Sequence, residues 1–238
     1  MASDREKFNK VRSRGKPSPN GKPGMHNHNR RNKYPVEASH EDRRAVKASM
    51  KYGAMSGVRM YSLVKAAQYV HRSGIRGDAV ICGVGLGGSA LALARAFRNA
   101  GDTRRPIWLY DTYDGAKRHA DDDYFASQKY VKTILKKWCP AYDQSAFRFV
   151  QGMVEDTIPG TVPDTISILH LDTDWYESTK HELIHLWPLL SEGGVVLIDD
   201  YGCWESARRA TDEYFAEHDI HILLTVVDHT GRIGVKGS

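Results

Sequence analysis

Two pairs of aspartates follow two short apolar runs in this 238-residue chain: Asp172 and Asp174 come after one run, and Asp199 and Asp200 come after another. If the two runs are neighbouring strands of a parallel sheet, four carboxylates meet at one edge. Like charges that close are unfavourable unless a cation or a proton compensates them. Mg²⁺ prefers such oxygen ligands, so the pattern predicts a divalent-cation site with positions open to a substrate. The alternative, that these acids only cap helices, leaves the second pair unexplained.

A glycine-rich segment is the second group with chemical potential. Residues 83–89 read Gly-Val-Gly-Leu-Gly-Gly-Ser and follow an apolar run. Glycine lets the backbone turn sharply and approach a ligand, and the helix expected next aims free N–H groups at that ligand. Gly83, Gly85 and Gly88 satisfy the G-x-G-x-x-G pattern of NAD enzymes, so the segment predicts a nucleotide-like cofactor without deciding which. Asp111, ending the next apolar run, is placed to accept hydrogen bonds from ribose hydroxyls, as in NAD and S-adenosylmethionine sites.

Alternating periods in the sequence predict the elements that position these residues. Short connections between strand-like and helix-like segments predict an α/β fold, a parallel sheet with helices on both faces, and two closing strands around a turn at 229–231 predict an antiparallel edge hairpin. Ligands of such sheets bind beyond the carboxyl ends of the strands. We expect strands over residues 79–82, 107–110, 147–150, 166–171, 195–198, 221–227 and 233–236, and helices around 60–67, 89–99, 122–138, 179–187 and 205–218. Thr179 and Glu182 have capping-box spacing at the start of the fourth helix.

Charge divides the chain into a basic tail and an acidic body. Residues 1–33 hold ten of the 34 basic residues but two of the 29 acidic ones, which leaves 24 basic and 27 acidic residues in the rest. The tail is rich in proline and glycine with little to bury, so we expect a flexible basic arm. The acidic body disfavours a nucleic-acid-binding protein, but the arm leaves weak contact with RNA open.

The remaining composition excludes several classes of protein. No apolar run approaches the ~20 residues needed to cross a bilayer, and the N-terminus has no apolar segment of a signal peptide. The three cysteines form no C-x-x-C pair, so neither a disulfide framework nor a cysteine zinc site is indicated. We expect a cytoplasmic protein, and the sequence leaves a homo-oligomer open.

The motifs around the aspartates resemble the macrocin O-methyltransferase family. Residues 170–179 read HLDTDWYEST and residues 193–202 read GGVVLIDDYG; shorter similarities cover residues 74–78, 111–115 and 152–159. The similarity runs from about Met55 to the C-terminus, with residues 1 to about 50 outside it. Members of this family use S-adenosylmethionine and Mg²⁺ to methylate deoxysugar hydroxyls of macrolide and aminocoumarin antibiotics.

This resemblance implies a fold and a domain organisation. The fold would be the Rossmann-like class I methyltransferase fold, with a mostly parallel seven-stranded sheet, an antiparallel edge hairpin and helices on both faces. Residues 1–33 would be the basic arm, residues 34–75 a helical lid or N-terminal extension, and residues 76–238 the methyltransferase domain.

The resemblance also implies roles for single residues. Asp172, Asp199 and Asp200 would be metal ligands and Asp174 the general base. The cofactor would have its ribose at Asp111, its methionine part at the loop of Gly83 and its adenine near residues 152–156. A segment that includes Met55 and Ser56 would close over it. The cofactor-binding residues expected are Met55, Ser56, Gly83, Gly85, Ser89, Asp111, Gly152 and Asp156.

The chain departs from the family pattern in two places. Ile81 stands where the family usually has an acidic residue, and Gly85 and Leu86 stand where it has a bulky residue and then a basic one. The missing acid removes an expected partner of the methionine ammonium group. The departure leaves open that this chain has lost S-adenosylmethionine binding.

The leading hypothesis is methyl transfer to a hydroxyl of a sugar-like or polyhydroxylated small molecule in natural-product tailoring. A catechol-type O-methyltransferase is the alternative within the class, because it too uses a carboxylate-bound Mg²⁺ and adjacent hydroxyls. The alternatives from other classes are an NAD-dependent oxidoreductase and an RNA-binding protein that uses the basic arm. Four aromatic residues near the aspartates are expected either to line an acceptor pocket or to belong to the core: Trp175, Tyr176, Tyr201 and Trp204.

Overall fold

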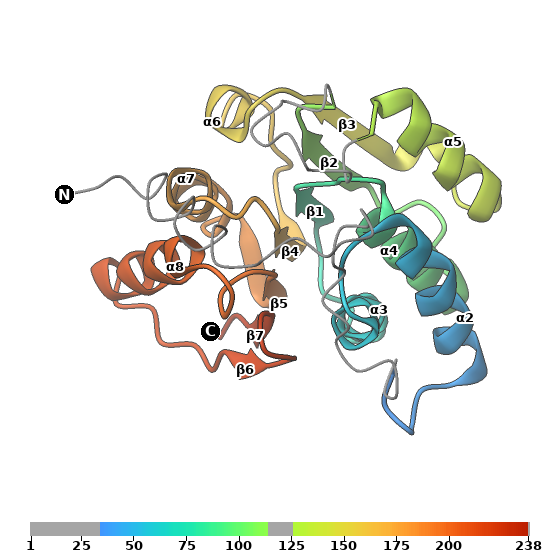
Figure 1. Cartoon of the computed structure of the whole chain (residues 1–238), viewed down its shortest axis with the longest axis horizontal. Coiled ribbons are helices and arrows are strands. Elements are labelled where there is room, and N and C mark those ends of the chain that lie inside the picture. Colours follow the sequence, from blue (N-terminus) through green and yellow to red (C-terminus); the bar gives the residue numbers. More distant parts are fainter. Residues whose placement is uncertain (1–33, 114–125, 238) are drawn as a thin grey trace, which may run out of the picture. The chain divides into compact units, whose positions relative to one another are not determined.

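The computed structural model describes residues 34–113 and 126–237. The expected basic arm at 1–33 lies outside the described residues, as do the last two residues of the motif at 111–115. Seven strands form one sheet in the order β3-β2-β1-β4-β5-β7-β6 (Figure 1). Strands β1 to β5 pair in parallel, and β7 runs antiparallel to both β5 and β6. The strands are β1 Asp78–Cys82, β2 Ile107–Asp111, β3 Phe147–Gln151, β4 Ile166–Leu171, β5 Leu190–Ile198, β6 Thr225–Val226 and β7 Arg232–Val235.

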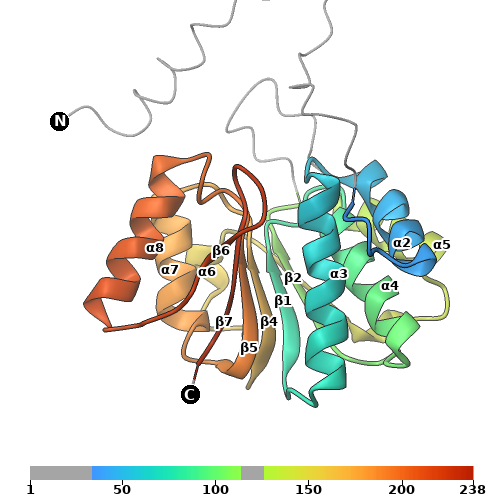
Figure 2. The ribbon, with the colours of Figure 1, turned by 90° about the horizontal axis from the view of Figure 1, so that it is seen from below.

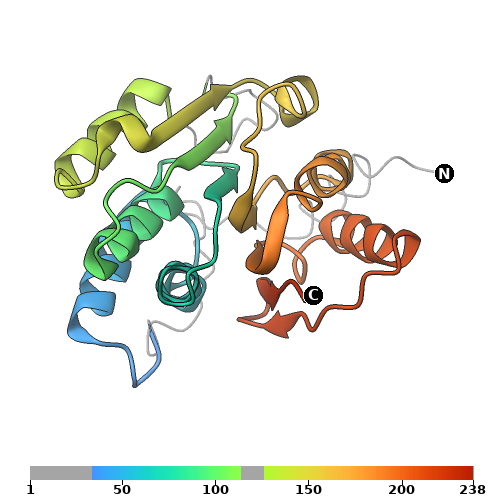
Figure 3. The same cartoon turned by 180° about the vertical axis from the view of Figure 1, so that it is seen from behind.

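Helices cover both faces of the sheet, which confirms the expected α/β class. Figure 2 shows α2, α3, α4 and α5 on one face and α6, α7 and α8 on the other, and the same two groups are seen from behind in Figure 3. The helices are α2 His40–Ser49, α3 Gly57–Arg72, α4 Gly88–Ala100, α5 Gln128–Trp138, α6 Val154–Thr157, α7 Tyr176–Leu186 and α8 Glu205–Glu217, with short 3₁₀ helices η1 Met50–Tyr52 and η2 Gln144–Ala146. Helices α2 and η1 lie within residues 34–75, where the resemblance implied a helical segment, whereas the sequence did not predict α6 or η2.

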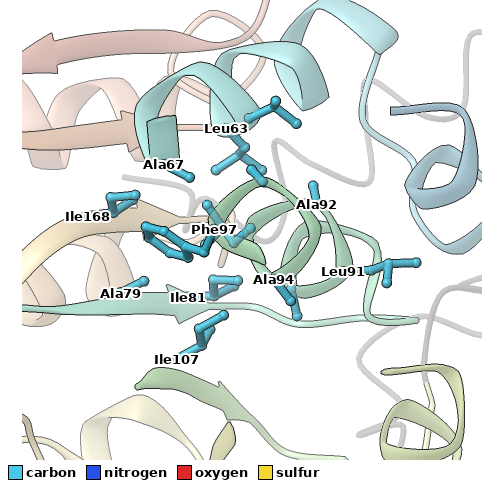
Figure 4. Packing of buried hydrophobic residues seen from close by; sticks show 14 of the residues in the cluster. Leu63, Ala67, Ala79, Ile81, Leu91, Ala92, Ala94, Phe97, Ile107 and Ile168 are labelled. Carbon is cyan, nitrogen blue, oxygen red and sulfur yellow. The ribbon is translucent and has the colours of Figure 1, made fainter. Parts of the chain in front are cut away.

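Each face of the sheet has its own apolar core. Alternate residues of a strand point to opposite faces, so Ile81 packs toward α3 and α4 while Cys82 packs toward α7 and α8. Figure 4 shows Ile81 beside Phe97 in the first core. The apolar stripes expected on α3 and α8 are buried as predicted: Met60, Leu63, Val64 and Ala67, and Ala207, Ala210, Tyr214 and Phe215.

Two helices begin at residues other than those expected. Helix α5 begins at Gln128, because the Ser127 side chain accepts a hydrogen bond from the Tyr130 amide and ends the preceding loop. The expected capping box is wrong: α7 begins at Tyr176, and Thr179 and Glu182 are buried inside the helix. The Thr173 hydroxyl donates to Glu182 Oε2 (3.2 Å), a tertiary contact that local spacing cannot reveal.

The C-terminal strands also differ in their limits. The strand expected over residues 195–198 begins earlier, because Gly193 and Gly194 also lie within β5. The Gly193 amide donates to Lys236 O and the Lys236 amide to Gly194 O, both at 2.8 Å, so pairing with the chain end keeps this stretch extended. Strand β6 covers only two residues of the predicted 221–227, and Leu223 within that range is 83% exposed.

Two expectations from composition can be compared with the described residues. Within residues 34–113 and 126–237, we find no helix long and apolar enough to span a membrane. The three cysteines are free: Cys82 and Cys139 are buried, and Cys203 is exposed.

Candidate active site

The carboxyl ends of β1, β4 and β5 lie side by side, as the two aspartate pairs required. Leu171 of β4 is in register with Cys82 on one side and Ile198 on the other. The ladder continues into the aspartates: the Asp172 amide donates to Cys82 O and the Asp199 amide donates to Leu171 O, both at 2.9 Å. The aspartates therefore start from fixed backbone positions at one edge of the sheet.

Three of the four carboxylates form a cluster, which we call the acidic rim: Asp172, Asp174 and Asp200. One oxygen from each lies within 4.8 Å of the others. Burial, and then the charges of Asp199 and Asp200, raise the pKa of Asp172 well above its usual range. Burial also raises the pKa of Asp200, although hydrogen bonds within the rim oppose this shift. Asp174 has φ +68°, a left-handed conformation that is uncommon outside glycine and is often found at functional sites.

The fourth carboxylate, Asp199, is paired with a cation instead. Arg59 Nη1 donates to Asp199 Oδ2, and the two side chains are only 12% and 7% exposed. The other oxygen, Oδ1, lies 3.9 Å from His170 Nε2. His170 is fully buried, and its ring nitrogens have no hydrogen-bond partner among the described residues. The structure thus separates Asp199 from the cluster, and the predicted ligand set of Asp172, Asp199 and Asp200 stays a prediction.

Arg59 also contacts the turn before β7. Its Nε donates to Asp228 Oδ2 (3.1 Å), and the Ser56 hydroxyl donates to the same oxygen (2.6 Å). Asp228 Oδ1 accepts from the amides of Thr230 and Gly231 at 3.0 and 2.9 Å. Burial raises the pKa of Asp228, but the bonds from Ser56 and Gly231 and the charge of Arg59 outweigh it, leaving a pKa of about 2.

The glycine-rich loop packs directly against the acidic rim. Gly83 has φ +88°, and a Cβ there would lie 2.1 Å from the Asp172 backbone oxygen. Gly87 is the left-handed N-cap of α4, which has no side-chain cap. The first amides of α4 therefore have no side-chain cap, and the binding of a nucleotide-like cofactor there stays a prediction.

Asp111 lies at the loop, but backbone groups use its carboxylate. The amides of Val84 and Gly85 donate to Oδ2 at 2.8 and 3.0 Å, and the Tyr113 amide donates to Oδ1 at 2.9 Å. Asp111 therefore fixes the shape of the loop. Its role toward ribose hydroxyls stays a prediction.

The segment before α3 covers the start of α4. The Ser89 hydroxyl donates to Met55 Sδ (3.3 Å), and both residues are buried. A Cβ at Gly88 would lie 2.6 Å from the Tyr52 oxygen and 2.9 Å from the Ser49 oxygen. Gly88 thus serves the close approach of η1, a packing role that the motif alone did not suggest.

The predicted adenine region, residues 152–156, directly follows β3. The Gly152 amide donates to Asp111 O (3.0 Å), so the residue lies beside the end of β2. Asp156 lies on α6 with an exposed side chain. The four aromatic residues Trp175, Tyr176, Tyr201 and Trp204 are half-buried and absent from the fully buried core.

Position 81, in β1, is one of those that depart from the family pattern, and its surroundings are apolar. Ile81 is fully buried in the core between β1 and α4 (Figure 4). It pairs in register with His170 of β4, so the unpartnered imidazole is its neighbour. No carboxylate stands at position 81 to meet an ammonium group.

The residues present nevertheless fit the two groups that the sequence implied. For a nucleotide-like cofactor, the fit rests on the uncapped α4 N-terminus and the glycine backbone beside it. For a divalent cation, it rests on an all-oxygen donor set whose members repel one another in the absence of a compensating charge.

Sequence reasoning missed three residues of this site: Arg59, His170 and Asp228. Two weak signals existed. Ser56 caps the helix that begins at Gly57, which places Arg59 in its first turn, and Asp228 directly precedes the expected turn. Neither signal shows that the two residues meet across 169 positions of sequence.

This combination of fold and site is that of a class I methyltransferase, with a glycine loop after β1, an acid ending β2 and a carboxylate cluster after β4 and β5. The profile of the family described as "Macrocin-O-methyltransferase (TylF)" matches residues 21–233. The chain belongs to this family and is an S-adenosylmethionine-dependent O-methyltransferase. The match begins well before Met55, so the expected start of the similarity was wrong.

Curated relatives agree with this assignment. The chain is 32% identical over 188 residues, 73% of this chain and 71% of the relative, to 8-demethyl-8-(2,3-dimethoxy-alpha-L-rhamnosyl)-tetracenomycin-C 4'-O-methyltransferase of Streptomyces olivaceus. It is 31% identical over 187 residues, again 73% and 71%, to demethyldecarbamoylnovobiocin O-methyltransferase of Streptomyces niveus. A mycinamicin III 3''-O-methyltransferase of Micromonospora griseorubida is 30% identical, covering 73% of this chain and 74% of the relative.

Solved structures support the fold. The O-methyltransferase NovP superposes with a TM-score of 0.71 at 27% identity, covering 79% of this chain and 83% of NovP. The methyltransferase PaMTH1 of Podospora anserina, solved with S-adenosylhomocysteine bound, has a TM-score of 0.57 at 15% identity over 100% of this chain and 98% of that one. The family assignment decides against the oxidoreductase alternative, while contact with RNA and a homo-oligomer stay predictions.

Proposed function

We propose that this chain transfers the methyl group of S-adenosylmethionine to a hydroxyl of a sugar-like or polyhydroxylated small molecule in natural-product tailoring. The printed names of its relatives support this substrate class, because they describe O-methylation of rhamnosyl-tetracenomycin, novobiocin and mycinamicin precursors. The observation that carries the proposal is the contact between Gly83 and the Asp172 backbone. A methyl donor at the glycine loop would therefore lie directly beside the carboxylates that handle the acceptor.

On the cofactor side, the proposal assigns the ribose to Asp111 and the methionine part to the loop of Gly83 and Gly85. Met55, Ser56 and Ser89 would cover the cofactor, since the Met55–Ser89 contact already closes the start of α4. Gly152 and Asp156 would lie nearer the adenine. Ribose hydroxyls can hydrogen-bond to Asp111 only if they share its oxygens with the loop amides or displace them.

On the acceptor side, Asp172, Asp199 and Asp200 would hold a divalent cation. Such a cation, when bound, acidifies and orients two adjacent hydroxyls of an acceptor. Burial, and after it the charge of neighbouring carboxylates, raises the pKa of Asp172 and of Asp200, and a cation held there would supply the compensating positive charge.

Asp174 would act as the general base. S-adenosylmethionine, when bound, would supply an electrophilic methyl group and keep the electrons of the broken carbon–sulfur bond on sulfur, and the Asp174 carboxylate would take the proton of the attacking acceptor hydroxyl. Asp174 is exposed next to the buried part of the rim, so an acceptor can reach it. Its left-handed backbone turns the chain between β4 and α7 at this residue.

The test is the Asp174→Asn variant. If Asp174 is the base and not a metal ligand, turnover falls by about 10² or more, while S-adenosylmethionine and Mg²⁺ bind as in the wild type. Calorimetry measures both affinities, and transfer to rhamnosyl and catechol acceptors measures turnover. Loss of Mg²⁺ affinity would make Asp174 a ligand, as its place in the cluster allows, and near-normal turnover would remove it from the reaction.

The matched control is Asp199→Asn. If the predicted ligand set is right, this change weakens Mg²⁺ binding, whereas a cation held by Asp172, Asp174 and Asp200 alone would tolerate it.

The acceptor class is tested by comparing the two acceptors. Faster methylation of the catechol than of the sugar would favour the catechol-type alternative.

A further inference from the structure

Arg59 lies where three separate parts of the chain meet. It belongs to the first turn of α3, its Nη1 binds Asp199 after β5, and its Nε binds Asp228 before β7. Ser56, which caps α3, donates to the same Asp228 oxygen. Because two hydrogen-bonded carboxylates hold one guanidinium group, the start of α3 is fixed against the end of the sheet.

The stretch before Arg59 contacts the other half of the site. Met55 accepts a hydrogen bond from Ser89 at the start of α4. The backbone of Ser49 and Tyr52 approaches Gly88 so closely that a Cβ there would clash. Residues 49–59 therefore touch the glycine loop at one end and the neighbours of the acidic rim at the other.

Charge gives Arg59 a further property. Its guanidinium group pairs with the carboxylates of Asp199 and Asp228, and all three side chains are mostly buried. A divalent cation at the acidic rim would compete with Arg59 for these charges. Cation binding would therefore change the interaction that holds the start of α3.

We propose that Arg59 is a positioning residue that couples cation binding at the acidic rim to cofactor binding at the glycine loop, through residues 49–59. This inference rests on the proposed function. Coupling between two sites is reciprocal, so each ligand changes the affinity of the other by the same factor. The residue acts through Asp199 and through the Met55 segment, without itself touching the reacting atoms.

The experiment compares Arg59→Met and Arg59→Lys with Asp228→Asn. Arg72→Met is the control, because Arg72 is an exposed arginine at the other end of the same helix. The dissociation constant of S-adenosylmethionine is measured by calorimetry with Mg²⁺ and with chelator. Hydrogen exchange of residues 49–59 is measured in the ligand-free protein.

In the wild type, we expect the two dissociation constants to differ by about fivefold or more, the usual size of such coupling. In Arg59→Met the ratio falls to about one, affinity drops by about tenfold, and residues 49–59 exchange faster. Asp228→Asn changes the same quantities in the same direction. Arg59→Lys, which keeps the charge but not both contacts, lies between, and Arg72→Met equals the wild type.

The inference is overturned if Arg59→Met keeps the wild-type ratio and affinity. If that variant does not fold, Arg59→Lys and Asp228→Asn decide by the same ratio. A wild type that binds no S-adenosylmethionine overturns the proposed function and this inference with it. A wild type that binds it with equal affinity in Mg²⁺ and chelator overturns the inference alone.

Discussion

At the ends of β1 and β2, backbone amides donate hydrogen bonds to one carboxylate, that of Asp111. At the ends of β4 and β5, several carboxylates lie close to one another. Asp111 accepts three backbone N–H groups, which fix the shape of its loop. The carboxylates of Asp172, Asp174 and Asp200 face each other instead, and the pKa values of Asp172 and Asp200 are raised. The Asp111 carboxylate is satisfied by backbone groups, whereas the carboxylates of the acidic rim need a cation or protons to reach the same condition.

This difference shows how one sheet edge can prepare two kinds of ligand site. Hydrogen bonds to Asp111 fix the glycine loop, so the cofactor binding that we propose there would have little structure to create. The cation that we propose at the acidic rim would relieve repulsion between its carboxylates and so add stability to the fold. Gly83 joins the halves, because its backbone lies against Asp172.

The largest effect should come from adding a methyl group where the backbone of Gly83 lies against Asp172. Gly83→Ala places a Cβ 2.1 Å from the Asp172 oxygen at φ +88°, and we expect a loss of about 3 kcal/mol or more, or failure to fold. Gly101→Ala is the matched control, because φ is +97° there and nothing lies within 4 Å. It should cost only about 1 kcal/mol. Denaturant unfolding measures the stability of both variants. Equal losses of stability in Gly83→Ala and Gly101→Ala would show that the close approach of Gly83 to Asp172 adds nothing to the cost.

The next effect concerns pH and the link between Arg59 and Asp228. The folded pKa of Asp228 is about 2, below its ordinary value of 3.8, so the ionised group stabilises the fold above pH 4. This stability, up to about 2 kcal/mol, is lost as the pH falls from about 4 to 2. Asp228→Asn should reduce the acid dependence of thermal unfolding in that window. An unchanged dependence would place the acid-sensitive interaction elsewhere.

The smallest effects should have opposite signs in the two halves. In chelator, Asp172→Asn removes one of the repelling charges and should raise stability. Asp111→Asn weakens hydrogen bonds from the loop amides and should lower stability by about 1–2 kcal/mol. Thermal unfolding of both variants measures the difference. A shift of the same sign in both would remove the distinction between the halves.

The parts of this molecule that were predictable from sequence are those governed by local patterns. The buried stripes of α3 and α8 follow from helical spacing, and the meeting of the two aspartate pairs follows from the rule for strand ends. The S-adenosylmethionine-dependent activity came from the motifs at 170–179 and 193–202, because periodicity could not choose between cofactors.

What was missed depends on contacts far apart in sequence. The Arg59–Asp199 pair spans 140 positions, and nothing in the spacing of either residue announces it. The capping-box pattern at Thr179 and Glu182 was wrong because both side chains are buried within α7, and Glu182 accepts a bond from Thr173 instead. Local rules fail where tertiary packing gives a polar side chain a different partner.

The most direct test of the account is a calorimetric titration of S-adenosylmethionine into the purified protein, once with Mg²⁺ and once with chelator, with NADH as the control ligand. We predict binding of S-adenosylmethionine with a dissociation constant in the range of about 1 μM to 1 mM, typical of enzyme substrates, and no binding of NADH. Failure to bind S-adenosylmethionine at millimolar concentration would contradict the account. It would mean that a site with Ile81 in place of an acid, and with Gly85 and Leu86 in its loop, has lost its cofactor.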